Sequence, residues 1–370
     1  MNNTADAVTQ KEYYIMMKKT LSLLLALLLG LSLLTGCSTD SGDAGDGGEQ
    51  TGEPVGETGE VGGEPSAEPV TIRLGGLKGP TSMGLVKLID DASQGLTESK
   101  IDFRMAGTAN ELTPLMVQGE LDVLAGPSNL AAILYQNTKG AVQFAAINTL
   151  GVIYLVEKGG NTVAAMEDLR GKTIYATGKG QIPEYALTYL LEQHGMEVGK
   201  DVEIEWKSEA TEVVATIAME DSAVALLPQP YVTVAQTQVE GLAIALNLTE
   251  QWDALQNGSQ LITAGLIVRR EFAEQHPEAL ATLMEEYAAS AAWINENVEA
   301  GAALCEKYDI VKAPVAQKAI PYCNITWIEG DEMKTALTGF LQVLFDRNAA
   351  AVGGAMPGDD FYLTTLPAAR

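Results

Sequence analysis

Strand–turn–helix units follow one another along this chain, and this repetition restricts its fold more than any other feature. Residues 70–74 (VTIRL) alternate and carry β-branched side chains, as a strand does, and a glycine-rich turn leads into a helical pattern at residues 82–92. Two more strand–turn–helix units occupy residues 101–118 and 121–136, and residues 142–147 form a fourth strand. Three such units in succession predict an α/β fold with a parallel sheet and right-handed crossovers.

A second α/β set fills the middle of the chain. Its expected strands are 172–176, 202–206 and 223–227, and its expected helices are 183–194 and 212–220. Pro183 suits the first turn of a helix, and Gly195 suits its C-terminal cap. An apolar strand at residues 262–268 and a long helix at 277–297 come next, and the remainder reads as largely helical. About 300 residues of folded chain favour two lobes over one.

The amino-terminal segment carries an export signal. Lys18 and Lys19 precede a leucine-rich run at residues 21–34, which has the length of a secretory signal and is short for a membrane span. The run ends in Leu34-Thr35-Gly36-Cys37, where small residues before a cysteine are typical of a bacterial lipobox. We therefore expect a lipoprotein signal peptide at residues 1–36 and a lipid on Cys37. An ordinary signal peptide, or a membrane anchor with a chance cysteine, is the alternative.

Residues 37–69 form an acidic, glycine-rich segment without a single Lys or Arg. It has too little apolar surface to offset the entropy of ordering, and its like charges repel one another. This composition predicts a disordered tether between the lipid and a folded part that begins near Val70.

The composition of the whole chain excludes several functions. There are 49 acidic and 23 basic residues, a net charge of -26, which argues against nucleic acid or an anionic membrane surface as a partner. With only two His and no CxxC spacing, we expect no metal, no cofactor and no catalytic residue. Cys305 and Cys323 are either a disulfide, which export favours, or two buried free thiols.

Four segments, taken in order, carry a resemblance to a known family. They are Gly119-Glu120-Leu121-Asp122-Val123 with Pro127 and Ala131-Ala132; Asp168-Leu169-Arg170-Gly171-Lys172 with Thr177-Gly178-Lys179-Gly180; Leu227-Pro228-Gln229-Pro230-Tyr231; and Val268-Arg269-Arg270-Glu271-Phe272 with His276-Pro277-Glu278. Their order and spacing over residues 70–345 resemble the solute-binding proteins of nitrate, taurine, alkanesulfonate and thiamine-precursor importers.

The resemblance implies the type II periplasmic-binding-protein fold, with two lobes that each have a central, mostly parallel sheet and are joined by a two-strand hinge. The first lobe would hold residues 70–155, the second 156–262, and residues 263–370 would return to the first lobe and form the C-terminal helices. The chain would cross between lobes near 149–156 and 261–268, and the lobes would close by a hinge motion.

Ligands of open parallel sheets bind beyond the carboxyl ends of the strands, where helix N-termini also favour anions. The candidate contacts are Pro80, Thr81, Ser82, Met83, Thr108, Asn110, Pro127, Ser128, Asn129, Thr149, Lys179, Gly180, Gln181, Gln229 and Tyr231. Each has a plainer interpretation, because Ser, Thr and Asn often only cap helices, Lys179 suits a solvated loop, and Met83 or Tyr231 suits a core or wall.

We therefore expect a monomeric, lipid-anchored binding protein on the outer face of the bacterial membrane. It would capture a small sulfonate-like or nitrate-like anion and deliver it to an ABC permease and its ATPase. Binding of a flat heterocycle, such as a thiamine-precursor pyrimidine, and a transporter-independent sensor remain alternatives. An enzyme is disfavoured, because neither His194 nor His276 lies where a catalytic base is expected.

Overall fold

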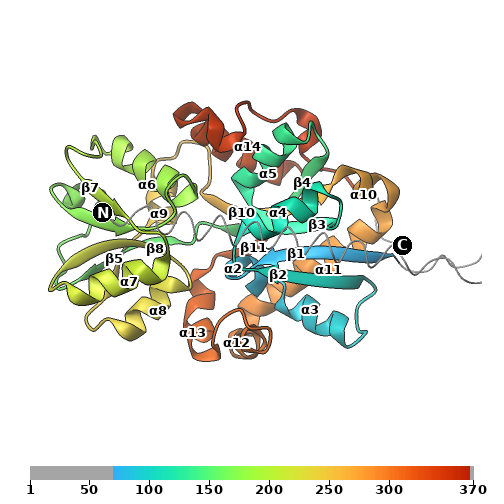
Figure 1. Cartoon of the computed structure of the whole chain (residues 1–370), viewed down its shortest axis with the longest axis horizontal. Helices are drawn as coiled ribbons and strands as arrows, with labels where there is room; N and C mark the ends of the chain where they lie inside the picture. The colour runs from blue at the N-terminus through green and yellow to red at the C-terminus, as the bar shows by residue number, and fades with distance from the viewer. Residues whose placement is uncertain (1–69, 367–370) are drawn as a thin grey trace, which may run out of the picture. The chain divides into compact units, whose positions relative to one another are not determined.

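The computed structural model describes residues 70–366, which form two lobes, each built on one β-sheet (Figure 1). The first sheet has the order β11 (Ile325–Glu329), β4 (Val142–Leu150), β10 (Ile262–Arg269), β3 (Val123–Pro127), β1 (Thr71–Leu77) and β2 (Lys100–Ala106). The second has the order β7 (Glu203–Trp206), β6 (Thr173–Ala176), β8 (Ala223–Pro228), β5 (Ile153–Lys158) and β9 (Ala243–Asn247). The predicted signal peptide, Cys37 and the tether lie outside the described residues.

Both sheets repeat one pattern of strand directions. In the first, β2, β1 and β3 are parallel, and the reversed strand β10 separates them from β4. In the second, β7, β6 and β8 are parallel, and the reversed strand β5 separates them from β9. Four strands of each sheet therefore point the same way, which confirms the predicted α/β class with two mostly parallel sheets.

The reversed strands are where the chain passes between the lobes. The first sheet ends at Leu150 and the second begins at Ile153, so the first crossing is Gly151–Val152. The boundary expected between residues 155 and 156 falls inside β5, because the apolar run continues through the crossing with only one glycine to mark it. The return crossing ends at Leu261, since β10 already belongs to the first sheet from Ile262.

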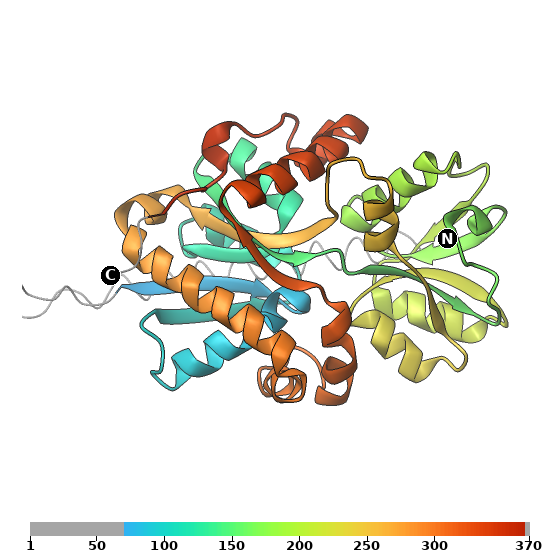
Figure 2. The same ribbon diagram turned by 180° about the vertical axis from the view of Figure 1, so that it is seen from behind.

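Helices cover both sheets. The first lobe has α2 (Pro80–Met83), α3 (Val86–Ser93), α4 (Ala109–Val117), α5 (Ser128–Asn137), α10 (Arg270–Gln275), α11 (Pro277–Glu296), α12 (Val298–Lys307), α13 (Ala313–Ala319) and α14 (Gly330–Arg347). The second has α6 (Ile182–Gln193), α7 (Ala210–Met219), α8 (Tyr231–Gln238) and α9 (Leu248–Ala254). From behind, α11 crosses the face of the first sheet (Figure 2). No helix within residues 70–366 is long and apolar enough to cross a membrane.

Two predicted elements differ from the structure. The helix expected over residues 82–92 is two helices, α2 and α3, which are interrupted at Gly84 and Leu85. The C-terminal part is not purely helical, because β11 pairs with β4 in antiparallel register. A five-residue strand among helices has little local signal, and pairing with its neighbour decides its conformation.

The Gly119–Asp122 segment and Arg269 have a structural role. The Asp122 carboxylate is buried and accepts hydrogen bonds from the backbone N–H of Arg73 (3.0 Å) and from its Nε (2.8 Å). Arg269 lies 3.6 Å from the same carboxylate and passes so close to Gly119 that a Cβ there would lie 2.4 Å from its Nη1. Gly119 also has a φ of 75°, which favours glycine. These motif residues therefore fix the first sheet rather than a ligand.

Cys305 and Cys323 are free thiols and 0% exposed. They lie in an apolar cluster with Met83, whose sulfur is 3.8 Å from the Cys323 sulfur. Burial raises the pKa of the Cys305 thiol to about 12, so the reactive thiolate is disfavoured at neutral pH. Of the two alternatives left by the sequence, the structure has the buried free thiols.

Candidate ligand-binding cleft

The turns that follow the parallel strands of both sheets face the crossing between the lobes. Strands β1 and β3 end at Leu77 and Pro127, and β8 of the second sheet ends at Pro228. The β8–β5 pairing joins Pro228 to Ile153, directly after the first crossing. In Figure 1, α2 and the end of β8 both lie in the middle of the molecule, where the two lobes meet.

Several predicted contacts use their side chains within the fold. Thr81 Oγ1 donates to Leu77 O (3.1 Å), Thr108 Oγ1 to Glu111 Oε1 (3.0 Å), Ser128 Oγ to Ile262 O (2.9 Å), Asn129 Nδ2 to Ala351 O (3.2 Å) and Thr149 Oγ1 to Asn148 Oδ1 (2.9 Å). Met83 is fully buried in the core. These residues shape the turns; the hydroxyl hydrogens are used within the fold, and the Asn129 amide nitrogen uses one of its two N–H donors there.

Ser82 and Gln229 differ from that group. The Ser82 side chain is 0% exposed, and its Oγ has no hydrogen-bond partner within the described residues. Gln229 is 2% exposed; its Oε1 accepts from Thr233 Oγ1 at 2.9 Å, whereas its Nε2 has no partner there. A buried polar group left unpaired costs about 1–3 kcal/mol. Ser82 and Gln229 are therefore the predicted residues whose polar groups remain available to a ligand.

Two further hydroxyls at the crossing, on Thr249 and Thr263, are also buried and unpartnered within the described residues. The sequence analysis did not select them. Thr249 is the second residue of α9, and Thr263 lies inside β10, so neither follows a parallel strand. No local pattern marks them, because their proximity to the cleft comes from the return of the chain between the lobes.

Strand register connects two of these groups, Ser82 and Thr263. A Cβ on Gly76 would lie 2.7 Å from Ser82 Oγ, and Gly76 pairs with Ala125 of β3. Pro127, two residues further along β3, pairs with Ala264, the neighbour of Thr263. These pairings place Ser82 and Thr263 on the same edge of the first sheet.

The crossing itself brings in the other two groups. A Cβ on Gly151 would lie 2.1 Å from Thr249 Oγ1, so this position has no room for a side chain. The Gln229 N–H donates to Val152 O at 2.9 Å. Asn324 Nδ2 donates to Gly151 O at 2.5 Å, which ties the start of β11 to the same crossing. The unpaired groups therefore extend from α2 to the crossing between the lobes.

Helix N-termini at the cleft are not equivalent. The first turn of α5, after Pro127, has no side-chain cap, so its backbone N–H groups face the strand end. At α6, by contrast, the Glu184 carboxylate accepts from the Gly180 N–H at 2.5 Å and occupies the position an anion would take. Lys179, Gly180 and Gln181 are exposed there. The α5 terminus is thus the better anion-binding turn.

The remaining candidates lie at the margins. Pro80 is the first residue of α2 and half-buried, and Asn110 is exposed on α4. Tyr231, at the start of α8, is 38% exposed. No Lys or Arg is among the buried residues between positions 70 and 366. The unpaired side-chain groups found near the crossing are therefore neutral: the hydroxyls of Ser82, Thr249 and Thr263 and the amide of Gln229.

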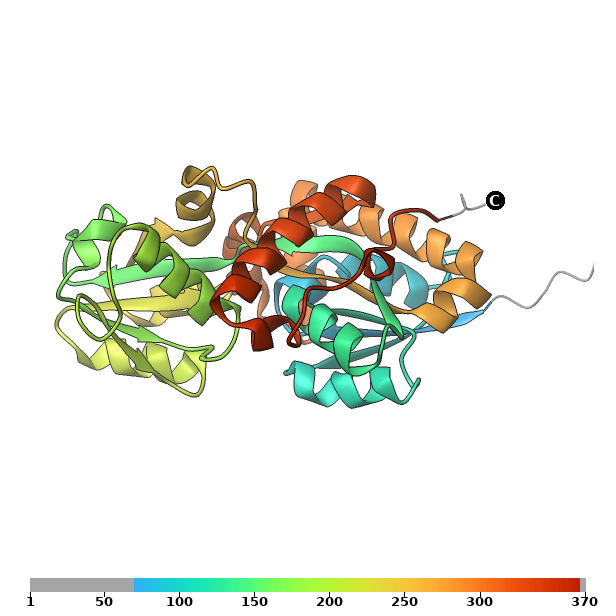
Figure 3. The same cartoon turned by 90° about the horizontal axis from the view of Figure 1, so that it is seen from above.

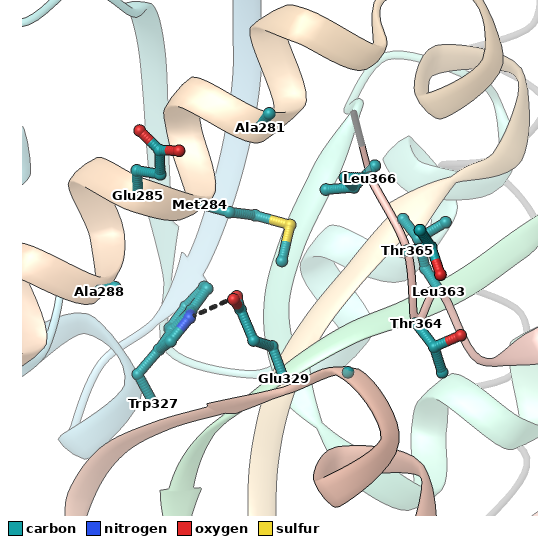
Figure 4. A pocket seen from close by; sticks show the side chains of 11 residues that line it. Ala281, Met284, Glu285, Ala288, Trp327, Glu329, Leu363, Thr364, Thr365 and Leu366 are labelled. Atoms are coloured by element: carbon teal, nitrogen blue, oxygen red, sulfur yellow. Dashed lines mark hydrogen bonds between the residues drawn. The ribbon is translucent and has the colours of Figure 1, made fainter. Parts of the chain in front are cut away.

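A second cavity, of about 370 Å³, lies at the opposite end of β11 (Figure 4). Met284 of α11 points across it toward the chain end at Leu363–Leu366, and Trp327 Nε1 donates to Glu329 Oε2 at 2.8 Å. Because β11 starts at the crossing and ends at Glu329, this cavity is separate from the strand-end cleft.

Comparison with known proteins agrees with this geometry. Residues 84–316, more than half of the chain, match the family described as the phosphonate ABC transporter periplasmic substrate-binding protein. This chain belongs to that family. Proteins of this kind bind small molecules outside the cytoplasm and interact with the permease and ATPase of an ABC importer. No curated protein gave a significant match.

Solved structures confirm the predicted two-lobed periplasmic-binding-protein fold. An ABC transporter protein from Parabacteroides distasonis has a TM-score of 0.67 at 20% identity, over 79% of this chain and 98% of its own. The periplasmic aliphatic sulphonate binding protein SsuA from Escherichia coli has a TM-score of 0.63 at 17% identity, over 79% and 93%. The SsuA protein from Xanthomonas axonopodis pv. citri, bound to MOPS, has 0.58 at 15%, over 81% and 98%. At these identities the likeness extends to the fold alone.

Proposed function

We propose that this protein is an extracytoplasmic binding lipoprotein that captures a small anion between its lobes and delivers it to an ABC importer. The anion would be of the sulfonate, phosphonate or nitrate kind, because the family is described as phosphonate-binding and its structural neighbours include sulphonate-binding proteins and a nitrate-binding protein from Synechocystis. We further propose that the protein acts as a monomer.

The observation that carries the proposal is the free amide of Gln229. Oε1 of this buried side chain already accepts from Thr233. The atom left without a partner is Nε2, which can only donate. A donor held in an otherwise apolar interior favours a ligand that supplies an acceptor oxygen. Ser82, Thr249 and Thr263 can each donate a hydroxyl hydrogen to the same group of oxygens.

The charge of the ligand follows from what surrounds it. Lys78 and Lys207, which follow the carboxyl ends of the parallel strands β1 and β7, already pair with Asp309 (2.7 Å) and Glu205 (2.6 Å). Neutral donors stabilise a single negative charge better than a double one, because no buried cation offsets the second charge. We therefore favour a monoanion, such as a sulfonate or nitrate, over a doubly charged phosphonate.

The proposal predicts a selective thermal shift. Methanesulfonate or nitrate should raise the unfolding midpoint of the protein in proportion to the logarithm of its concentration, because ligand binds only the folded state. Methylphosphonate at pH 8 should give a smaller shift, and sodium chloride at equal ionic strength is the control. A shift with a pyrimidine and none with any anion would contradict the proposal and favour the heterocycle alternative.

Anchoring through Cys37 is the second part of the proposal and rests on the lipobox sequence alone. In a bacterial host the full chain should partition into the detergent phase of a Triton X-114 extraction, and Cys37→Ala should move it to the aqueous phase. Cys323→Ala is a matched control that should stay in the detergent phase. Detergent partitioning that persists in Cys37→Ala would point instead to an uncleaved membrane anchor.

A further inference from the structure

The last helix of the first lobe ends against the second lobe. Seen from above, α14 runs from the first lobe toward the second (Figure 3). Its final residue, Arg347, forms two parallel hydrogen bonds with Glu192 near the end of α6: Nη1 to Oε2 at 2.7 Å and Nη2 to Oε1 at 2.6 Å. This bidentate pair joins elements that belong to different lobes.

Neighbouring groups hold the Arg347 side chain in place. Its guanidinium lies 5.7 Å from the centre of the Tyr189 ring, also on α6, and Asn348 Nδ2 lies 3.5 Å from the Tyr185 hydroxyl. The planar fork of an arginine matches a carboxylate in one geometry only, so the pair specifies direction as well as distance. The Arg347 hydrogen bond lowers the pKa of Glu192, which keeps the carboxylate ionised at neutral pH.

The pair lies next to an aromatic contact between the lobes, because the Tyr189 ring that faces Arg347 also packs against Trp252. Trp252 of α9 is fully buried between Tyr189 (4.7 Å between ring centres) and Phe340 of α14 (5.7 Å). Arg347 is seven residues beyond Phe340, or about 10 Å along the helix. A movement of the lobes that separates α14 from α6 therefore displaces Arg347 from Glu192, and an increase of about 1 Å exceeds hydrogen-bond distance.

The arrangement of the lobes that contains this pair also buries the proposed binding groups. Ser82 of the first lobe and Gln229 of the second are both buried in it. Helix α6, which carries Glu192, begins at Ile182, directly after the turn of Lys179–Gln181 that follows strand β6. Contact at one end of α6 is thus connected through the helix to a turn that the sequence predicts to face the ligand.

We propose that Arg347 is a positioning residue that latches the two lobes together through Glu192 and so favours the arrangement in which ligand is enclosed. The inference rests on the proposed binding of ligand between the lobes. Arg347 acts on the ligand through the lobe orientation and does not touch it.

The first test measures lobe orientation without any ligand. Spin labels on Leu96→Cys and Lys200→Cys, exposed positions in the first and second lobes, report the inter-lobe distance in the full chain carrying Cys37→Ser. The buried native thiols are not labelled. We expect Arg347→Gln to broaden the distance distribution toward longer values, and the charge exchange Arg347→Glu with Glu192→Arg to narrow it again.

A matched control is the ion pair of Arg170 with Asp201, which lies within the second lobe at 2.8 Å. Arg170→Gln should leave the inter-lobe distances unchanged. The proposed latch would be wrong if Arg347→Gln gave the same distances as the parent chain, or if the charge exchange did not restore the parent distances.

The second test measures affinity for methanesulfonate by calorimetry. Exposed ion pairs contribute about 0.2–1 kcal/mol, so Arg347→Gln should raise the Kd by a factor between about 1.4 and 5, with little change in the thermal midpoint. Altered distances with no methanesulfonate binding in any variant would support the latch and overturn the proposed anion. Unaltered Kd and unaltered distances, with methanesulfonate bound, would overturn the latch alone.

Discussion

Gln229→Glu is expected to weaken binding of methanesulfonate at least about 100-fold while leaving the fold intact. The substitution keeps Oε1 as the acceptor for Thr233 and replaces only the unpaired donor with a carboxylate oxygen. A hydrogen bond to a charged group contributes about 1.5–3 kcal/mol, and a like charge about 4 Å away costs about 4 kcal/mol at an effective dielectric constant of 20. About 2.8 kcal/mol already corresponds to a 100-fold change in Kd.

Isothermal calorimetry of the two proteins checks this result. Gln236→Glu, at an exposed position on α8, the helix that follows Gln229, adds the same charge and should bind like the parent chain. A Gln229→Glu protein that is folded and binds the anion with unchanged Kd would remove Gln229 from the site. If the parent chain binds an organic cation and not methanesulfonate, the proposed sign of the ligand charge is wrong.

Trp252→Ala should have the largest effect on stability, a loss of about 3–5 kcal/mol from the free energy of unfolding. Trp252 is 0% exposed, packs between Tyr189 and Phe340, and donates from Nε1 to Ser259 Oγ at 3.0 Å. Alanine would leave a cavity where α6, α9 and α14 meet, between the two lobes. Urea unfolding followed by circular dichroism measures the loss.

Two variants control for this effect. Trp252→Phe keeps most of the ring packing and should recover more than half of the lost free energy. Trp206→Ala, at the end of the edge strand β7, removes a half-buried ring and should cost clearly less than Trp252→Ala. Equal losses for Trp252→Ala and Trp206→Ala would mean that the packing between the lobes adds nothing beyond ordinary burial.

Elements with strong local patterns were predictable from the sequence. Strands β1, β3 and β8 have β-branched or apolar runs that end at glycine or proline, so their positions and the turns after them were found within a few residues. Strands β9 and β11 were not predicted, and β5 was expected only as part of a hinge strand near residues 149–156. Their conformation depends on partners that are distant in sequence, and no local turn signal marks their ends.

The candidate site shows the same division. Ser82 and Gln229 were proposed from their place after parallel strands, whereas Ser128 and Asn129, proposed on the same grounds, use their side chains inside the fold. A sequence cannot separate these cases, because a hydroxyl at a helix start has the same local pattern whether its partner is a backbone carbonyl or a ligand. Thr249 and Thr263 had no local signal at all.

The sequence by itself determined the α/β class, the two lobes and the family resemblance, because strand and turn chemistry are local and repeat in order along the chain. Only the tertiary structure decided which polar groups remain unpaired, that both cysteines are free thiols, and that Arg347 of the first lobe meets Glu192 of the second. These features join residues up to 155 positions apart. They depend on how the two lobes pack, which local patterns do not encode.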